Sequence, residues 1–165
     1  MARKRADVRA TPPAPPLLAL DTSCLVALVC GWHEHHAATL AAADQRLDTG
    51  FQLALAAPAL LETYCVLTRL PAPHRLSPID ALQLLRDNFQ EQARTVVLGA
   101  EDYWALLRSG PDGGIYGGRT YDAVIAACAR KARVQEILTL NLRHFESFAD
   151  SSLLIRSPLS AAAGR

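Results

Sequence analysis

This sequence of 165 residues lacks several features that would assign it to a specialised class of protein. No apolar run is long enough to span a bilayer, and the net charge is only +1, which argues against the broad basic surface of a sequence-specific DNA-binding module. Its four cysteines form no Cys-x-x-Cys pair and sit inside apolar runs. They predict buried, reduced thiols rather than a disulfide framework; they are Cys24, Cys30, Cys65 and Cys128.

The length suits one domain with a full hydrophobic core, and half of the residues are hydrophobic. Residues 1–16 are basic and rich in proline, which is typical of a flexible lead-in. We expect the folded domain at 17–157 and a C-terminal tail at 158–165. Basic residues precede the apolar run from Leu17 to Val29, but Asp21 interrupts that run and no cleavage site of small residues follows. A cytoplasmic protein is therefore expected, with no membrane partner.

Apolar segments of strand length alternate with segments of helical periodicity along the chain, which predicts an α/β fold with a parallel sheet covered on both faces. The glycine-rich segment 109–118 predicts a long loop. Strands are expected at 17–20, 51–56, 95–98, 136–140 and 152–155, and helices at 25–31, 33–47, 58–70, 78–90, 100–108, 120–133 and 141–148.

Asp21 directly follows the first expected strand, Leu17–Leu20. Open α/β sheets bind their ligands in the crevice beyond the carboxyl ends of the strands, which is where this acid would lie. Because a lone buried carboxylate is costly, Asp21 should be paired, exposed in a cleft or bound to a cation. The alternative from this stretch alone is that Asp21 only caps the following helix.

Two further acids stand near the starts of expected helices. The neighbours of Glu62 at three and four residues, Cys65 and Val66, are apolar, so Glu62 is predicted to share a helix face with core residues. Asp122 precedes a stripe of small and apolar residues suited to packing on a sheet, which predicts an inward-facing acid at the helix start. For both acids, a role in capping or in favouring the helix dipole is the alternative.

Asn141 follows the fourth expected strand, and Thr139 would point the same way in an extended chain. Asparagine is also a preferred helix cap. In a right-handed parallel fold, Asp21, Glu62, Asp122 and Asn141 can converge at one edge of the sheet. Three clustered acids repel one another unless a divalent cation neutralises them, and oxygen ligands suit Mg²⁺ or Mn²⁺. Such a site can activate water for attack on a phosphodiester.

Four segments, taken together, resemble the PIN domain family of metal-dependent ribonucleases, and especially the VapC-type toxins of bacterial type II toxin–antitoxin modules. Their order and approximate spacing agree over about residues 17–155. The matching segments are Leu20–Ser23, Leu61–Thr63, Gly118–Ala127 and Leu138–Phe145.

This resemblance implies a three-layer α/β/α PIN-like fold with a central, mainly parallel sheet of about five strands. It also implies an endoribonuclease that requires Mg²⁺ or Mn²⁺, with Asp21, Glu62 and Asp122 as catalytic metal ligands and Ser23 or Thr22 supporting them. A homodimer is implied as well, acting on RNA and inhibited by a small VapB-like antitoxin. That partner would occupy an apolar groove and place a basic side chain near the acids.

Many members of that family carry an aspartate where this chain has Asn141, so the site loses a negative charge and the number of bound ions stays open. We interpret Asn141 as an outer ligand that Thr139 helps to orient. Arg119 and Arg143 flank the predicted site and are candidate phosphate contacts. Solvation of arginines near helix ends explains them equally well.

Two other functions compete with the nuclease. One is a non-catalytic PIN-like domain that binds RNA or protein and has a weakened metal site. The other is a phosphohydrolase with an aspartyl nucleophile, which typically needs a second aspartate where this chain has Ser23. The run His33–His36 lacks the HExxH spacing of zinc proteases and is interpreted as surface or packing histidines. The glycines of 113–118 lack the lysine and hydroxyl of a P-loop and would instead let RNA approach.

Overall fold

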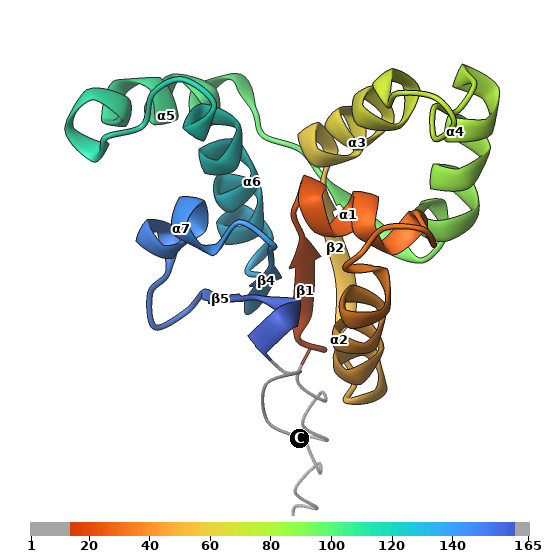
Figure 1. Ribbon diagram of the computed structural model, residues 1–165. Coiled ribbons are helices and arrows are strands. Elements are labelled where there is room, and N and C mark those ends of the chain that lie inside the picture. Colours follow the sequence, from red (N-terminus) through yellow and green to blue (C-terminus); the bar gives the residue numbers. More distant parts are fainter. Residues whose placement is uncertain (1–13, 161–165) are drawn as a thin grey trace, which may run out of the picture.

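A five-stranded parallel sheet forms the centre of the molecule, whose residues 14–160 are described by a computed structural model (Figure 1). The strand order is β3-β2-β1-β4-β5, and every neighbouring pair runs parallel. The strand order therefore reverses between β1 and β4, which is the switch point where open α/β sheets bind ligands. The strands are β1 (Leu17–Leu20), β2 (Gln52–Ala56), β3 (Ala93–Val96), β4 (Glu136–Leu138) and β5 (Leu154–Arg156).

Helices connect the strands and lie on both sides of the sheet (Figure 1). The first helix packs against the second and third, while the sixth packs against β2 and β3. This arrangement confirms the predicted α/β fold with a parallel sheet. The helices are α1 (Thr22–Val29), α2 (His36–Asp48), α3 (Ala57–Arg69), α4 (Pro78–Leu85), α5 (Ala100–Gly113), α6 (Arg119–Ala132) and α7 (Leu142–Phe145), with a π-helical turn η1 (Arg86–Gln90) and a 3₁₀ turn η2 (Glu146–Phe148).

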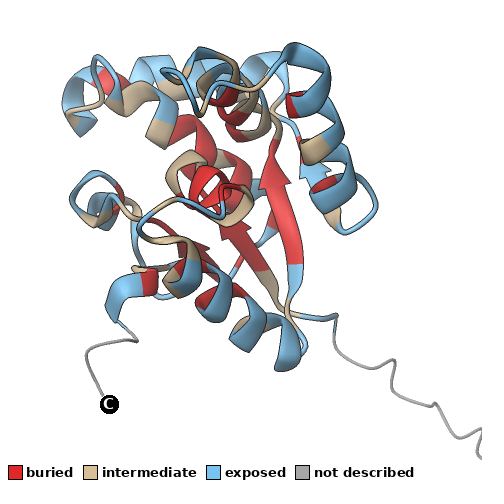
Figure 2. Ribbon diagram, turned by 45° about the vertical axis from the view of Figure 1, so that its right-hand side comes forward, coloured by how far each residue is buried: buried red, intermediate tan, exposed pale blue. Residues whose placement is uncertain are grey.

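The core lies between the sheet and its helices, as the buried residues of Figure 2 show. Leu18, Leu20 and Ile137 from the central strands have no exposed surface. On α6 the buried residues are mostly small, including Ala126 and Ala129, so that this helix can pack closely against β2 and β3. The stripe of small residues predicted below Asp122 is thus confirmed as a packing face.

Several boundaries differ from those expected. Helix α1 begins at Thr22, three residues before the expected start, because Asp21 caps it. Helix α2 begins only at His36, after turns at His33–His35, and strand β3 occupies 93–96 rather than 95–98. The expected helix over 78–90 divides into α4 and the π-helical turn η1. Cys65 is exposed, so the prediction that all four thiols are buried was wrong for this one.

The predicted loop over 109–118 was also wrong for its first half, since α5 continues to Gly113 despite Pro111. Gly114 then ends the helix in the left-handed conformation, with φ of 62°, and Gly110 O accepts hydrogen bonds from the amides of Gly114 and Ile115. This is how glycine closes a helix C-terminus. The glycines therefore form a helix end and a short turn rather than a long open loop.

Replacing Gly114 by alanine should cost about 1 kcal/mol of folding free energy, because an L-residue is strained in the left-handed region. The matched control is Gly118→Ala: its φ is −60°, and no atom lies within 4 Å of the added Cβ. That control should leave stability unchanged or slightly raised. Urea unfolding of both variants measures the difference, and equal midpoints would contradict the role given to Gly114.

The predicted lead-in and tail lie partly outside the described residues, at 1–13 and 161–165, so those two boundaries and the domain limits stay predictions. Within residues 14–160, no helix is both long enough and apolar enough to cross a membrane.

Candidate active site

Asp21 lies at the switch point of the sheet, immediately after β1, and only 2% of its surface is exposed. Its Oδ1 accepts a hydrogen bond from the backbone amide of Cys24 at 2.9 Å and so caps α1. Burial raises the pKa of the Asp21 carboxyl, and the hydrogen bonds from Cys24, Ser23 and Thr139 offset this only in part. The capping role expected as the alternative is therefore confirmed for Asp21, and its role in a metal site stays a prediction.

A network of hydroxyl groups ties Asp21 to the end of β4. Ser23 Oγ donates to both carboxylate oxygens of Asp21, at 2.7 and 2.9 Å, and accepts from the backbone amide of Leu140. Thr139 Oγ1 donates to Asp21 Oδ2 at 2.8 Å and accepts from the amide of Asn141 at 2.9 Å. The two chain segments that leave β1 and β4 are thereby fixed to each other around one buried carboxylate.

Glu62 enters from the first half of α3, and its position differs from the prediction. The buried face of α3 is made by Ala59, Thr63 and Leu67, whereas Glu62 is exposed. Its Oε2 accepts a hydrogen bond of 2.6 Å from the hydroxyl of Thr22, the residue after Asp21. Glu62 therefore joins the Asp21 region through Thr22 rather than by facing the core.

Asp122 lies in the first turn of α6 and is half-buried. Its desolvation raises the pKa of the carboxyl, His144 and Arg119 lower it, and the nearby charge of Glu62 raises it further. Glu62 and Asp122, which are 60 positions apart, thus lie near enough for their charges to repel. His144 Nδ1 lies 3.2 Å from Asp122 Oδ2.

His144 is the one contact of these acids that the sequence did not suggest. It belongs to α7, the helix that begins directly after Asn141. The only signal in the sequence was that His144 lies three residues after Asn141, a polar residue expected to follow a strand. Asn141 is exposed at the start of the same helix, with its amide held by Thr139. Arg143 is exposed, whereas the guanidinium of Arg119 contacts other parts of the chain, described below.

The ligand chemistry of this region fits a hard divalent cation, because it consists of carboxylate, amide and hydroxyl oxygens. Neither Asp21 nor Glu62 forms an ion pair with a basic residue within 14–160. In the described part of the chain, however, no three His, Cys, Asp or Glu side chains lie close enough together to hold a metal ion. Glu62 is held by Thr22, the neighbour of Asp21, whereas Asp122 is held by His144, and the three carboxylates make no direct contact with one another.

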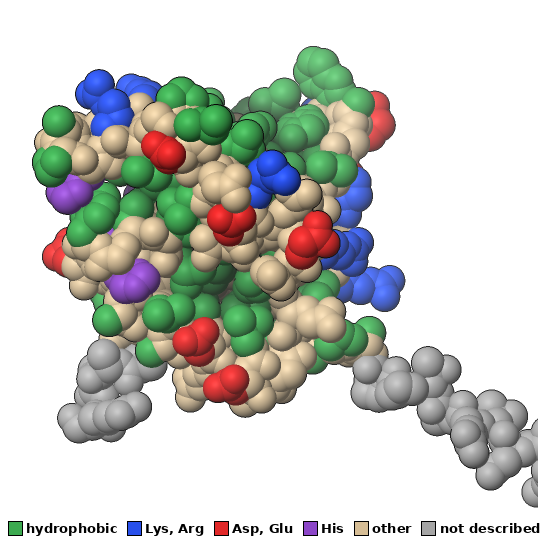
Figure 3. Space-filling model, turned by 90° about the vertical axis from the view of Figure 1, so that its right-hand side faces the viewer, with side chains coloured by type: hydrophobic (Ala, Val, Ile, Leu, Met, Phe, Trp, Pro, Cys, Tyr) green, Lys and Arg blue, Asp and Glu red, His purple; other side chains and the backbone are tan. Residues whose placement is uncertain are grey.

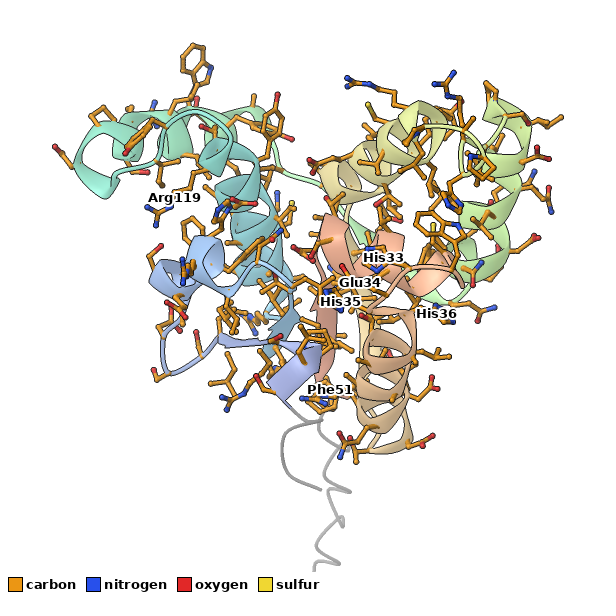
Figure 4. All side chains as sticks on the ribbon, in the orientation of Figure 1. His33, Glu34, His35, His36, Phe51 and Arg119 are labelled. Carbon is orange, nitrogen blue, oxygen red and sulfur yellow. The ribbon has the colours of Figure 1, made fainter. Side chains whose placement is uncertain are left out.

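The histidine-rich run lies away from these acids, at the connection between α1 and α2, where Figure 4 labels His33, Glu34, His35 and His36. His36 Nδ1 lies 2.9 Å from the carbonyl oxygen of Ala27 and links the two helices. His33 and His35 are half-buried there, with ring centroids 5.6 Å apart. These contacts agree with the interpretation of the run, from the sequence, as surface or packing histidines.

Comparison with known proteins agrees with this architecture. The model of the PIN domain family matches residues 18–150. Ribonuclease VapC40 of Mycobacterium tuberculosis is 37% identical over 132 residues, covering 80% of this chain and 92% of its own length. Ribonuclease VapC27 of the same organism is 38% identical over 133 residues, covering 81% and 90%.

Among solved structures, the crystal structure of VapBC2 from Rickettsia felis, bound to a DNA fragment from its promoter, aligns with a TM-score of 0.59 at 17% identity. The alignment covers 86% of this chain and 98% of that one, and it supports the α/β/α fold with the central parallel sheet. From the matched model and the two mycobacterial relatives, the chain belongs to the PIN domain family and resembles its VapC members.

Proposed function

We propose that this protein is a metal-dependent endoribonuclease that hydrolyses RNA phosphodiester bonds and serves as the toxin of a VapBC-type toxin–antitoxin module. Its relatives VapC40 and VapC27 carry the name ribonuclease at 37% and 38% identity. The observation that carries the proposal is the buried carboxylate of Asp21 at the switch point of the sheet, which Ser23 and Thr139 fix and to which Glu62 is linked through Thr22.

In this proposal Asp21, Glu62 and Asp122 are the catalytic carboxylates and would hold Mg²⁺ or Mn²⁺, with Asn141 as an outer ligand. When bound, the ion neutralises the clustered charge and makes its bound water more acidic. Ser23 and Thr139 fix the two oxygens of Asp21.

Thr22 holds Glu62 by its hydroxyl. Arg143, which is exposed on α7 next to His144 in the sequence, is the proposed contact for an RNA phosphate.

We further propose a VapB-like antitoxin as partner, a homodimer, and a cytoplasmic location. Apolar side chains are exposed on α3 and α4: Leu61 is 72%, Ile79 75% and Leu82 51% exposed. Figure 3 shows hydrophobic side chains at the surface on the side of the molecule that carries these helices. Such a surface fits the apolar groove expected for the antitoxin. The VapBC2 structure of similar fold is one toxin–antitoxin assembly of this kind.

RNA cleavage is the direct test. The purified chain should cleave single-stranded RNA in the presence of Mn²⁺, and excess EDTA should remove the activity, which added Mn²⁺ then restores. Glu62→Gln should lose activity, while Glu101→Gln, an exposed glutamate of α5, should retain it. Cleavage that survives EDTA would contradict metal dependence. Absence of both cleavage and divalent-ion binding would favour the non-catalytic PIN-like binding domain.

A further inference from the structure

One face of α6 contacts the segment that follows β4 and Asn141. Three residues of this helix, Arg119, Asp122 and Arg130, each reach the segment Leu142–Asp150. Their spacing of three and eight residues places them on the same side of the helix. The segment thus contacts α6 along almost three turns.

Arg119 makes the first of these contacts. Its guanidinium donates to Ser147 Oγ and to Gly114 O, the latter at 3.4 Å, and lies 5.6 Å from the centre of the Phe148 ring. Its Nε is buried without a hydrogen-bond partner among the described residues. Figure 4 shows Arg119 between α5 and α7. A guanidinium engaged in this way is held on the protein rather than extended towards a phosphate, unlike the role predicted from the sequence.

Arg130, almost three turns along α6, makes the last contact. It forms an ion pair with Asp150 and donates to the carbonyl oxygen of Phe148. Between the two arginines, Asp122 meets His144. All three contacts end on the same short piece of chain.

Apart from its contacts with α6, the segment is anchored in the core by the fully buried ring of Phe145. Helix α7 has 4 residues and η2 has 3, and isolated helices of that length are unstable in water. Between Leu142 and Asp150 only Phe145 is buried. The position of the exposed His144 therefore depends on the contacts with α6 as well as on the buried Phe145, while the amide of Asn141 is also held by Thr139.

We propose that Arg119 and Arg130 are positioning residues, which dock the segment 142–150 on α6 and thereby set where His144 holds Asp122 and where Asn141 faces the acids. This inference rests on the proposed function, in which Asp122 and Asn141 serve the metal site. It assigns Arg119 to the architecture of the site instead of to substrate binding.

The test compares Arg130→Met with Lys131→Met. Lys131 is the next residue of α6 and is equally exposed, but its ion pair, 2.7 Å long, is with Asp102 of α5. Arg130→Met should speed hydrogen exchange in 141–150 and weaken Mn²⁺ binding, measured by calorimetry, by about 10-fold, as for loss of partners outside the ligand set. Lys131→Met should change neither quantity.

Two further variants separate positioning from general destabilisation. Arg130→Lys keeps the charge and should restore part of the Mn²⁺ affinity. Asp150→Asn should weaken it without adding to Arg130→Met, because the ion pair between the two side chains is already lost in Arg130→Met. If hydrogen exchange in 141–150 were unchanged in Arg130→Met, Arg130 would not dock this segment on α6. If exchange were faster but the Mn²⁺ affinity unchanged, Arg130 would not position the site. If the unaltered protein bound no Mn²⁺, the proposed function would be overturned instead. The comparison of hydrogen exchange in Arg130→Met and Lys131→Met would still decide whether Arg130 docks the segment on α6.

Discussion

The Asp21→Asn variant should lose RNA cleavage by about 100-fold or more and yet melt at a higher temperature than the unaltered protein at pH 7. Asp21 is 2% exposed, and its pKa is raised because burial outweighs its hydrogen bonds. Keeping the carboxylate ionised at neutral pH therefore opposes folding. An asparagine removes the buried charge and can still accept from the Cys24 amide through Oδ1, and its Nδ2, in place of Oδ2, can donate to the hydroxyl oxygen of Thr139.

The sign of the pH dependence follows from the raised pKa. Between the ordinary pKa of an aspartate and the raised folded-state pKa of Asp21, the unfolded chain has released a proton that the native protein still holds, so the free energy of unfolding falls as pH rises through this range and stays at its lower value above it. Below the unfolded-state pKa, both states are protonated and the advantage of Asp21→Asn should disappear. A gain of about 1 kcal/mol corresponds to about 2–4 °C in a chain of this length.

Calorimetric melting curves at pH 4 and pH 7, recorded without divalent ions, measure this effect. Asp112→Asn changes an exposed aspartate of α5 and should shift neither the melting temperature nor the activity. If Asp21→Asn melted at a lower temperature than the unaltered protein at pH 7, the carboxylate would stabilise the fold, contrary to its raised pKa. Full RNA cleavage by Asp21→Asn would remove Asp21 from the catalytic set.

The sequence was most informative where a polar residue follows an apolar strand. Asp21 was placed correctly at a strand end, because a buried strand is recognisable in four residues, whereas β4 ends at Leu138, so Asn141 lies three residues beyond the strand rather than directly after it. The link from Thr139 to Asp21 follows from the same logic, since β1 and β4 are neighbours. Most of the site prediction was therefore based on recognising the strands and the edge at which parallel strands end.

The sequence predicted less well which face of a helix is turned towards the core. Glu62 was expected on the core face of α3 because of its neighbours Cys65 and Val66, but Cys65 is exposed and the core face runs through Ala59, Thr63 and Leu67. A rotation of one residue, about 100°, is enough to exchange the two faces. In a helix with apolar residues on several sides, this rotation is decided by packing against its neighbours, which here include α1, α4 and β2.

Contacts between polar residues that lie far apart in the chain could not be predicted from the sequence. His144 and Asp122 lie 22 positions apart, and Arg119 and Ser147 lie 28 apart, so no local periodicity links them. They meet because α6 and α7 pack together after β4. Arg119 was interpreted as a phosphate contact since its position flanks an acid, whereas its direction is set by Ser147 and Phe148.

Mn²⁺ should stabilise the protein strongly if the three acids form one metal site. A ligand at 100 times its dissociation constant adds about 2.7 kcal/mol to the free energy of unfolding, or about 5–11 °C at this chain length. The shift should be smaller in Glu62→Gln and Asp122→Asn, each compared with its own metal-free melting temperature. Asp44→Asn, an exposed aspartate of α2, provides the control and should keep the full shift.

Protons should compete with Mn²⁺, because carboxylates bind metal in their ionised form. The pKa values of Asp21 and Asp122 are both raised, so these side chains take up protons at a higher pH than ordinary aspartates. The Mn²⁺-induced shift should therefore shrink as pH falls through their raised pKa values, before ordinary surface aspartates protonate. A shift of equal size in Asp122→Asn, or one that does not depend on pH, would mean that Mn²⁺ binds elsewhere on the chain. In that case the hydrogen bonds of Asp21, Glu62 and Asp122 would serve the fold alone.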